Sequence, residues 1–240
     1  MKILLSRIYL IFASTCLVLL TACSDDDDDV VMTPDPPAPV EVSYEVSIAN
    51  LTEGQLLSPV SIILHKDEQL WQIGQPASEA LEKVAESGDN TDLLAQSYVL
   101  ASTSGEGPIM PGENATLMVS TTDSDATKLS VASMLGNTND AFTGLNAIDL
   151  SSLSVGDSQG FYTFAYDAGT EANTESADTV PGPAAGGTGE GFNSMRDDSR
   201  DMVLMHQGVV SMDDGLASSA LGQAQRFDNM VARVVITRVE

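Results

Sequence analysis

The sequence predicts an all-β domain: an antiparallel β-sandwich with one short helix and long loops. Short segments of strand character alternate with turn signals along most of the chain, as in sandwich folds. Residues 42–48 alternate strictly between apolar and polar side chains, and residues 231–239 are rich in β-branched ones, so both ends of the domain are expected to be strands. With 240 residues, 42% hydrophobic and only 5% aromatic, the chain has room for one domain with an aliphatic core.

The remaining elements follow from local signals. A second strand is expected at 58–64, with Pro59 at its start, where a missing N–H is tolerated. Ser78 is placed to cap a helix over 79–86, and Gly88 to end it. The glycine- and proline-rich residues 179–193 are expected to form a flexible loop that does not pack. Further elements are expected at 91–96 (a helical turn) and, as strands, at 98–101, 115–120, 128–135, 145–150, 160–165, 201–206 and 230–239.

The first 22 residues are expected to be a signal peptide rather than part of the fold. Lys2 and Arg7 precede the apolar run 8–20, which is too short and wrongly flanked for a lasting membrane span. The ending Leu20-Thr-Ala-Cys23 resembles the lipobox of bacterial lipoproteins, which implies cleavage before Cys23 and its lipidation. The alternative is an ordinary secreted protein with one unpaired cysteine.

Residues 23–40 are expected to be a tether, and residues 41–240 the folded domain. The block Asp25–Asp29 carries five like charges and does not fold, and the prolines after it favour an extended spacer. Ser24 after the lipidated cysteine fits transport to the outer membrane in the lipoproteins that the motif resembles. A cell-envelope location follows, with the periplasmic and the surface-facing side both open.

The charge of the chain excludes one class of partner. The formal net charge is −25, from 10 Lys and Arg against 35 Asp and Glu. A surface of this sign repels phosphate backbones, so no nucleic acid is expected to bind. It also concentrates divalent cations near the protein.

Two acidic loops are candidates for a cation site. Residues 165–175 place Asp167 and Glu171 around a glycine bend, and Asn139 and Asp140 lie in a loop upstream. Calcium prefers six to eight oxygen ligands in a flexible shell, which such loops supply. The alternative is that both are ordinary polar turns, since Asp, Asn and Gly are the usual turn residues.

Enzymatic chemistry has weak support in the sequence, and no enzyme is expected. The two histidines, His65 and His206, do not have the spacing of zinc ligands. The chain also lacks a Gly-x-Ser-x-Gly elbow that would present a serine nucleophile. His206 is expected to end a strand and hydrogen-bond a loop.

A series of motifs in order gives the chain a resemblance to one family. The motifs are Asn50-Leu-Thr-Glu-Gly-Gln55, Trp71-Gln-Ile-Gly74, Pro111-Gly112, Thr138-Asn-Asp-Ala-Phe-Thr-Gly144, Tyr166-Asp-Ala-Gly-Thr-Glu171, His206-Gln-Gly208 and Val231-Ala-Arg-Val234. With these motifs the chain resembles a spondin domain, in the form carried by many bacterial lipoproteins and in the amino-terminal domains of F-spondin and mindin. The resemblance covers about residues 42–240.

The resemblance implies a C2-like antiparallel sandwich with a divalent cation between loops at one end, and the oxygen ligands of the loops favour calcium. The family's ligand aspartates correspond to Asp140 and Asp167. The family's glutamate on an earlier strand has no counterpart, since Met118 occupies that position. Glu171 is the expected substitute, with Asn139, Asn173 and Glu175 as weaker candidates.

The predicted lipid anchor at Cys23 and the predicted cation site together indicate a function. We expect a lipid-anchored, non-enzymatic binding or adhesion module of the cell envelope, with an envelope, glycan or protein ligand. The alternatives are a structural envelope protein whose ion only stabilises the fold, and a hydrolase.

Overall fold

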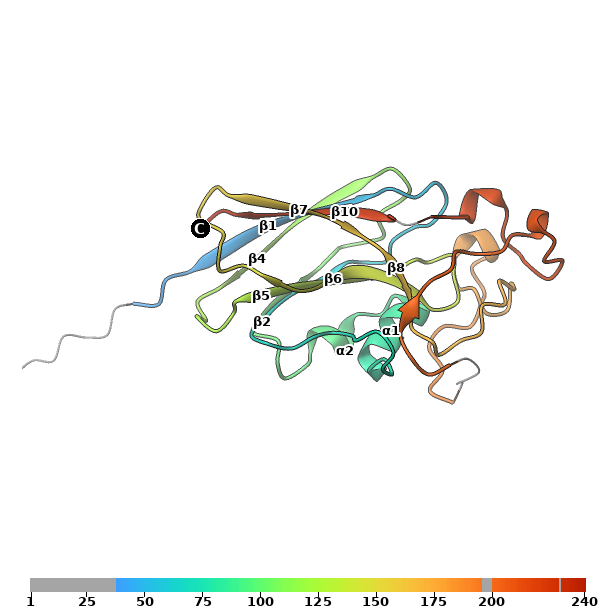
Figure 1. Ribbon diagram of the computed structural model, residues 1–240, viewed down its shortest axis with the longest axis horizontal. Coiled ribbons are helices and arrows are strands. Elements are labelled where there is room, and N and C mark those ends of the chain that lie inside the picture. Colours follow the sequence, from blue (N-terminus) through green and yellow to red (C-terminus); the bar gives the residue numbers. More distant parts are fainter. Residues whose placement is uncertain (1–37, 196–199, 229) are drawn as a thin grey trace, which may run out of the picture. The chain divides into compact units, whose positions relative to one another are not determined.

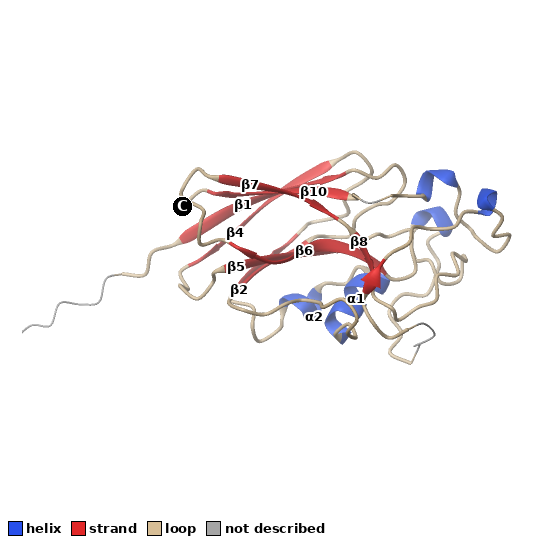
Figure 2. Cartoon of the chain, in the orientation of Figure 1, coloured by secondary structure: helices blue, strands red, loops and turns tan. Residues whose placement is uncertain are grey.

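Two antiparallel β-sheets form the domain in the computed structural model, which describes residues 38–195, 200–228 and 230–240 (Figures 1 and 2). All strand pairs are antiparallel, so the expected all-β sandwich is confirmed. The first sheet has the order β4 (Asn114–Thr121), β1 (Val42–Asn50), β10 (Ala232–Arg238), β7 (Ser158–Thr163). The second has the order β3 (Ala101–Ser104), β2 (Ser61–His65), β5 (Lys128–Met134), β6 (Ala141–Asp149), β8 (Ala165–Asp167), β9 (Leu204–Met205).

The main core lies between the two sheets and follows from the alternation along β1. Val46 pairs with Leu117 on β4 and with Ile236 on β10, so the apolar positions of three strands share one face. Val46 and Ile236 are fully buried. Burying an aliphatic side chain of this size contributes about 1.5–3 kcal/mol, which makes this face the main source of stability.

Two helices cover the outer face of the second sheet. Helix α1 (Glu79–Ser87) begins where Ser78 Oγ accepts a hydrogen bond from Leu81 N at 3.3 Å and ends at Gly88 in the left-handed conformation, as the sequence predicts. Its apolar stripe, together with Leu93 of the short α2 (Thr91–Leu94), forms a second core against the sheet. This second core includes Ile63, Leu81, Val84, Ala85, Ala132, Phe142, Ala168 and Val203.

The strand expected at 145–150 begins four residues earlier than predicted. Residues 141–144, expected in a loop, continue β6 because Phe142 is fully buried in the second core. Gly144 allows β6 to approach β5 closely, since a Cβ there would lie 1.8 Å from Val131 O.

The strand expected at 160–165 is divided between the two sheets. Residues up to Thr163 pair with β10 in the first sheet, and residues from Ala165 pair with β6 in the second. Phe164 lies between them, and its carbonyl accepts a hydrogen bond from Thr143 Oγ1 at 2.8 Å. Local sequence could not predict this crossing, because both halves have strand character.

Other predicted bounds also needed correction. The strand expected at 201–206 is only the two-residue β9, and that expected at 98–101 is β3, three residues later. Residues 179–193 do pack, contrary to prediction: Val180 and Ala185 form a third small core with Val209 and Leu221. In the described chain, three 3₁₀ helices lie in the loops at the end of the domain opposite the start of β1 (Figure 2). They are Pro183–Ala185, Met212–Asp214 and Gln223–Gln225.

The predicted signal peptide and nearly all of the predicted tether lie outside the described residues. Within the described ranges, no helix is long and apolar enough to cross a membrane. The described chain enters the domain at β1, at the end of the sandwich that also holds the C-terminus (Figure 1).

Candidate metal centre

The two predicted aspartates lie next to each other where β6 begins and β8 ends. Ala141 pairs with Asp167, and Ala168 N donates to the backbone carbonyl of Asp140 at 3.1 Å. The edge strand β9 extends this end of the sheet, with Leu204 opposite Asp167. In Figure 1 these strand ends and their loops lie at the end of the domain opposite the start of β1.

Asp140 is a fully buried carboxylate, and only one of its two oxygens accepts hydrogen bonds from described residues. Its Oδ2 accepts hydrogen bonds from Thr170 N at 2.9 Å and Glu171 N at 3.0 Å, while its Oδ1 has no hydrogen-bond partner among the described residues. Burial, and then the charge of Asp167, raise the pKa of Asp140 well above its usual range. Because a buried polar atom without a partner is costly, this oxygen is the one in the loop cluster that a cation would satisfy.

Asp167 closes the turn that carries those amides to Asp140. Its Oδ1 accepts from Gly169 N and its Oδ2 from Asn173 Nδ2, each at 2.8 Å. Gly169 has φ +80°, and a Cβ there would lie 2.2 Å from Met202 O, so no other residue fits without a shift. Asp167 therefore makes the side-chain to backbone hydrogen bond that is usual for Asp in a turn. Its charge also raises the pKa of Asp140.

Asn139 and Glu171 join the loops on either side of the aspartates. The Asn139 Nδ2 donates to Thr179 Oγ1 at 2.7 Å and to Glu171 Oε2 at 3.3 Å. The Asn139 Oδ1 accepts from Glu175 N at 3.2 Å. Asp140, Asp167 and the weaker candidates thus lie in one loop cluster. A ligand role for Asn139, Glu171, Asn173 or Glu175 stays a prediction.

Glu86 and Thr170, which the sequence does not predict as part of the site, also belong to this loop cluster. Thr170 Oγ1 donates to Glu86 Oε1 at 2.7 Å, and Glu86 Oε2 accepts from Asn193 N at 3.2 Å. Glu86 is 1% exposed, and its charge adds to the rise in the pKa of Asp140. The available signal was its place beside Ala85 on the buried side of α1, where a carboxylate needs polar partners.

His206 hydrogen-bonds a loop at the end of β9, as expected. Its Nδ1 accepts from Gly208 N at 2.9 Å, so the ring proton is assigned to Nε2, which is buried without a partner among the described residues. Burial lowers the pKa of His206 and keeps the ring neutral. In this arrangement neither ring nitrogen has a free lone pair to offer a metal ion.

The donor set fits a hard cation better than a soft one. Asp140 and Asp167 supply charged oxygens, and the surrounding loops are rich in carbonyl and hydroxyl oxygens that calcium accepts as neutral ligands. Over the described ranges, no group of three or more His, Cys, Asp or Glu side chains is arranged as a metal site. A cation here would therefore be held by two carboxylates and completed by neutral oxygens.

A cavity of about 730 Å³ opens beside Asp167. It combines apolar side chains with a carboxylate, two amides and the guanidinium of Arg200, a mixture typical of ligand pockets. The remaining lining residues are Ile73, Asn173, Leu204, Met205 and Gln207.

One side-chain arrangement resembles part of a hydrolase site but is closed to substrate. Ser130 Oγ lies 2.8 Å from His65 Nε2, and His65 Nδ1 lies 3.8 Å from Glu68 Oε2. Ser130 and His65 are fully buried, and Ser130 Oγ also accepts a hydrogen bond from Ala147 N at 2.8 Å. The hydroxyl therefore supports the sheet and is not presented to solvent.

A family model matches the part of the chain that carries these loops. The family model Spondin_N matches residues 55–183, which is more than half of the chain. The matched range contains Glu86, Asp140, Asp167 and Glu171, while His206 lies beyond it. A search of curated proteins found no match.

Proposed function

The chain belongs to the Spondin_N family, and from this premise we propose that it is a lipid-anchored, non-enzymatic binding or adhesion module of the bacterial cell envelope. Its apical loops would be held by a divalent cation, calcium. The observation that carries the proposal is Asp140: fully buried, hydrogen-bonded to two amides through Oδ2, unsatisfied at Oδ1 by any described residue, and beside a second carboxylate.

Asp140 and Asp167 are the residues that would hold the ion. Calcium would supply positive charge where two neighbouring carboxylates otherwise repel each other. The amides of Thr170 and Glu171 already orient Asp140, so little rearrangement is needed to present Oδ1. Because Thr170 also donates a hydrogen bond to Glu86, an ion that fixes this loop would also stabilise its contact with the end of helix α1.

The position of the acidic loops, and the cavity beside them, support a binding function over a purely structural role of the ion. The chain enters the domain at the end opposite the acidic loops (Figure 1). The cavity beside Asp167 adjoins these loops and offers space for a ligand next to the proposed ion.

The cation is tested by thermal melting of the mature chain in chelator and in calcium, magnesium or manganese. At a hundred times its dissociation constant, an ion that binds only the folded state adds about 2.7 kcal/mol. For a domain of this size, that corresponds to a rise in Tm of roughly 5–10 °C. A Tm unchanged by all three ions contradicts the site.

Comparison of Asp140→Asn with a charge-matched control separates loss of ion binding from the general effect of removing one negative charge. The Asp140→Asn variant should weaken the calcium response, since an amide oxygen can still ligate but carries no charge. In chelator it should melt at or above the wild-type Tm, because it removes a buried charge. Asp213→Asn changes the same charge at an exposed side chain and should keep the response. An Asp140→Asn variant that still responds like wild type would show that the charge of Asp140 does not hold the ion.

Binding is tested separately from stability. The mature chain, with and without calcium, is tested for binding to isolated envelope glycans and envelope proteins. Asp167→Ala should remove the calcium-dependent part of any binding. If calcium raises Tm but none of these components binds, the structural alternative replaces the proposal.

A further inference from the structure

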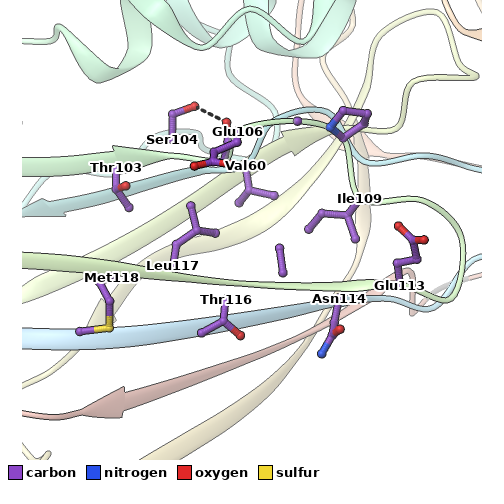
Figure 3. A pocket seen from close by; sticks show the side chains of 14 residues that line it. Val60, Thr103, Ser104, Glu106, Ile109, Glu113, Asn114, Thr116, Leu117 and Met118 are labelled. Atoms are coloured by element: carbon purple, nitrogen blue, oxygen red, sulfur yellow. Dashed lines mark hydrogen bonds between the residues drawn. The ribbon is translucent and has the colours of Figure 1, made fainter.

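The strands β3 and β4 each have one unpaired edge, and these edges face each other along one side of the sandwich. Within the described part of the chain, β3 pairs only with β2, and β4 only with β1. A cavity of about 410 Å³ lies between them (Figure 3). Open strand edges are templates for another extended chain, unless a protein blocks them.

The backbone of β4 offers hydrogen-bonding groups toward this groove. Asn50 N donates to Glu113 O at 2.9 Å, which sets the phase of the β1–β4 ladder. Alternation in an antiparallel pair then directs the amides and carbonyls of Ala115 and Leu117 to β1. Those of Thr116 and Met118 point away from β1, to the open edge.

The floor of the groove is apolar. Figure 3 shows the side chains of Val60, Ile109 and Leu117 pointing into the space between the two strands. The side chains of Thr116 and Met118 lie on the other side of β4 (Figure 3). An added strand could therefore place alternate apolar side chains into the groove while its backbone pairs with β4.

The mouth of the groove is acidic. Glu106 and Glu113 line it, both are exposed, and neither side chain makes a hydrogen bond or ion pair among the described residues. No Lys or Arg of the described ranges lines the groove. A second copy of the chain would bring the same carboxylates on a protein of net charge −25, so repulsion disfavours it.

We propose that the open edge of β4 binds an extended, cationic polypeptide segment as an additional strand. Alternate apolar side chains occupy the floor at Val60, Ile109 and Leu117, and the positive charge of the segment is attracted to the exposed carboxylates of Glu106 and Glu113 at the mouth. This partner surface is distinct from the acidic loops of the proposed cation site and does not depend on the ion.

The test uses the mature chain and a fluorescent peptide, acetyl-Lys-Val-Lys-Val-Thr-Val-Lys-amide, with binding measured by anisotropy in chelator. We expect saturable binding that weakens with salt. The same peptide methylated on alternate backbone nitrogens cannot pair as a strand and should not bind. A peptide with Glu in place of Lys should bind at least tenfold more weakly, because it meets like charge.

Protein variants locate the site. Thr116→Pro removes an amide that points to the open edge, where proline is tolerated, so the ladder to β1 should survive. It should weaken binding at least tenfold with little change in Tm. Glu106→Gln with Glu113→Gln should weaken binding roughly fivefold, as expected for exposed charges. Glu53→Gln, an exposed carboxylate outside the groove, should leave it unchanged.

Three results would overturn the proposal. The first is no saturable binding up to 1 mM peptide, a value on the order of the weakest useful affinity. The second is equal binding of the methylated peptide. The third is self-association of the chain, seen by sedimentation, that Thr116→Pro abolishes, which would make a second copy the occupant.

Discussion

Thr170 donates its Oγ1 hydrogen to Glu86 Oε1 at 2.7 Å, joining two residues 84 positions apart in the sequence. The backbone N–H of the same threonine donates to Asp140 Oδ2. One residue therefore connects the last turn of α1 with the buried carboxylate at the start of β6. The loop after β8 is held from both sides, which is why its amides reach Asp140.

Thr170→Val should test this connection. Valine keeps the shape of the side chain but leaves the buried Glu86 Oε1 without this donor, at a cost of about 1–3 kcal/mol. We expect a Tm lower by roughly 3–10 °C and a weaker calcium response. Thr170→Ser keeps the hydroxyl and should stay near wild type in both. Equal losses in the two variants would show that the methyl contacts of Thr170 matter as much as its hydrogen bond to Glu86.

Gly169→Ala should disorder the same loop through the backbone. Its positive φ strains any L-residue by roughly 1–2 kcal/mol, and the new Cβ would also overlap Met202 O. Gly74 has the same φ of +80°, but a Cβ there would meet nothing within 4 Å among the described residues, so Gly74→Ala isolates the backbone strain. We expect Gly169→Ala to lower Tm clearly more than Gly74→Ala, measured by calorimetry. Similar shifts would mean that the contact with Met202 relaxes freely.

His65 should make the domain sensitive to acid. Burial lowers the pKa of His65, with Lys128 adding to the effect and the nearby carboxylate of Glu68 opposing it. The unfolded state then takes up a proton that the folded state does not, so stability falls as pH drops from about 6.5 toward the depressed pKa. The slope from one such proton is about 1.4 kcal/mol per pH unit.

The control is His65→Gln, followed by urea unfolding between pH 7.5 and 5. The variant should lose part of the acid destabilisation, and the remainder should include His206, whose pKa burial also lowers. Identical pH profiles for wild type and His65→Gln would assign the acid sensitivity to other groups.

Cys23 should decide where the protein is found. The predicted lipobox implies acylation of Cys23, and acyl chains give membrane affinity that a net charge of −25 cannot. Cys23→Ser should move the protein from the membrane fraction to the soluble fraction without changing the Tm of the domain. Retention of the variant in the membrane fraction would exclude the anchor.

The sequence alone determined the elements whose signals are local. The alternation over Val42–Ile48 predicted β1 because a half-buried strand repeats every two residues, and Ser78 and Gly88 predicted both ends of α1 through capping chemistry. The aspartates, each in a polar turn segment, also stood out as a pair through the motifs that carry the family resemblance.

Only the tertiary structure decided the relationships that depend on distant pairing. It divides one apparent strand at Phe164 between two sheets, packs the glycine-rich segment around Val180, and adds Glu86 and Thr170 to the acidic loops. Among the described strands, it also leaves the edges of β3 and β4 open. Local sequence is silent on these points, because strand partners and buried hydrogen bonds are selected by contacts between residues far apart in the chain.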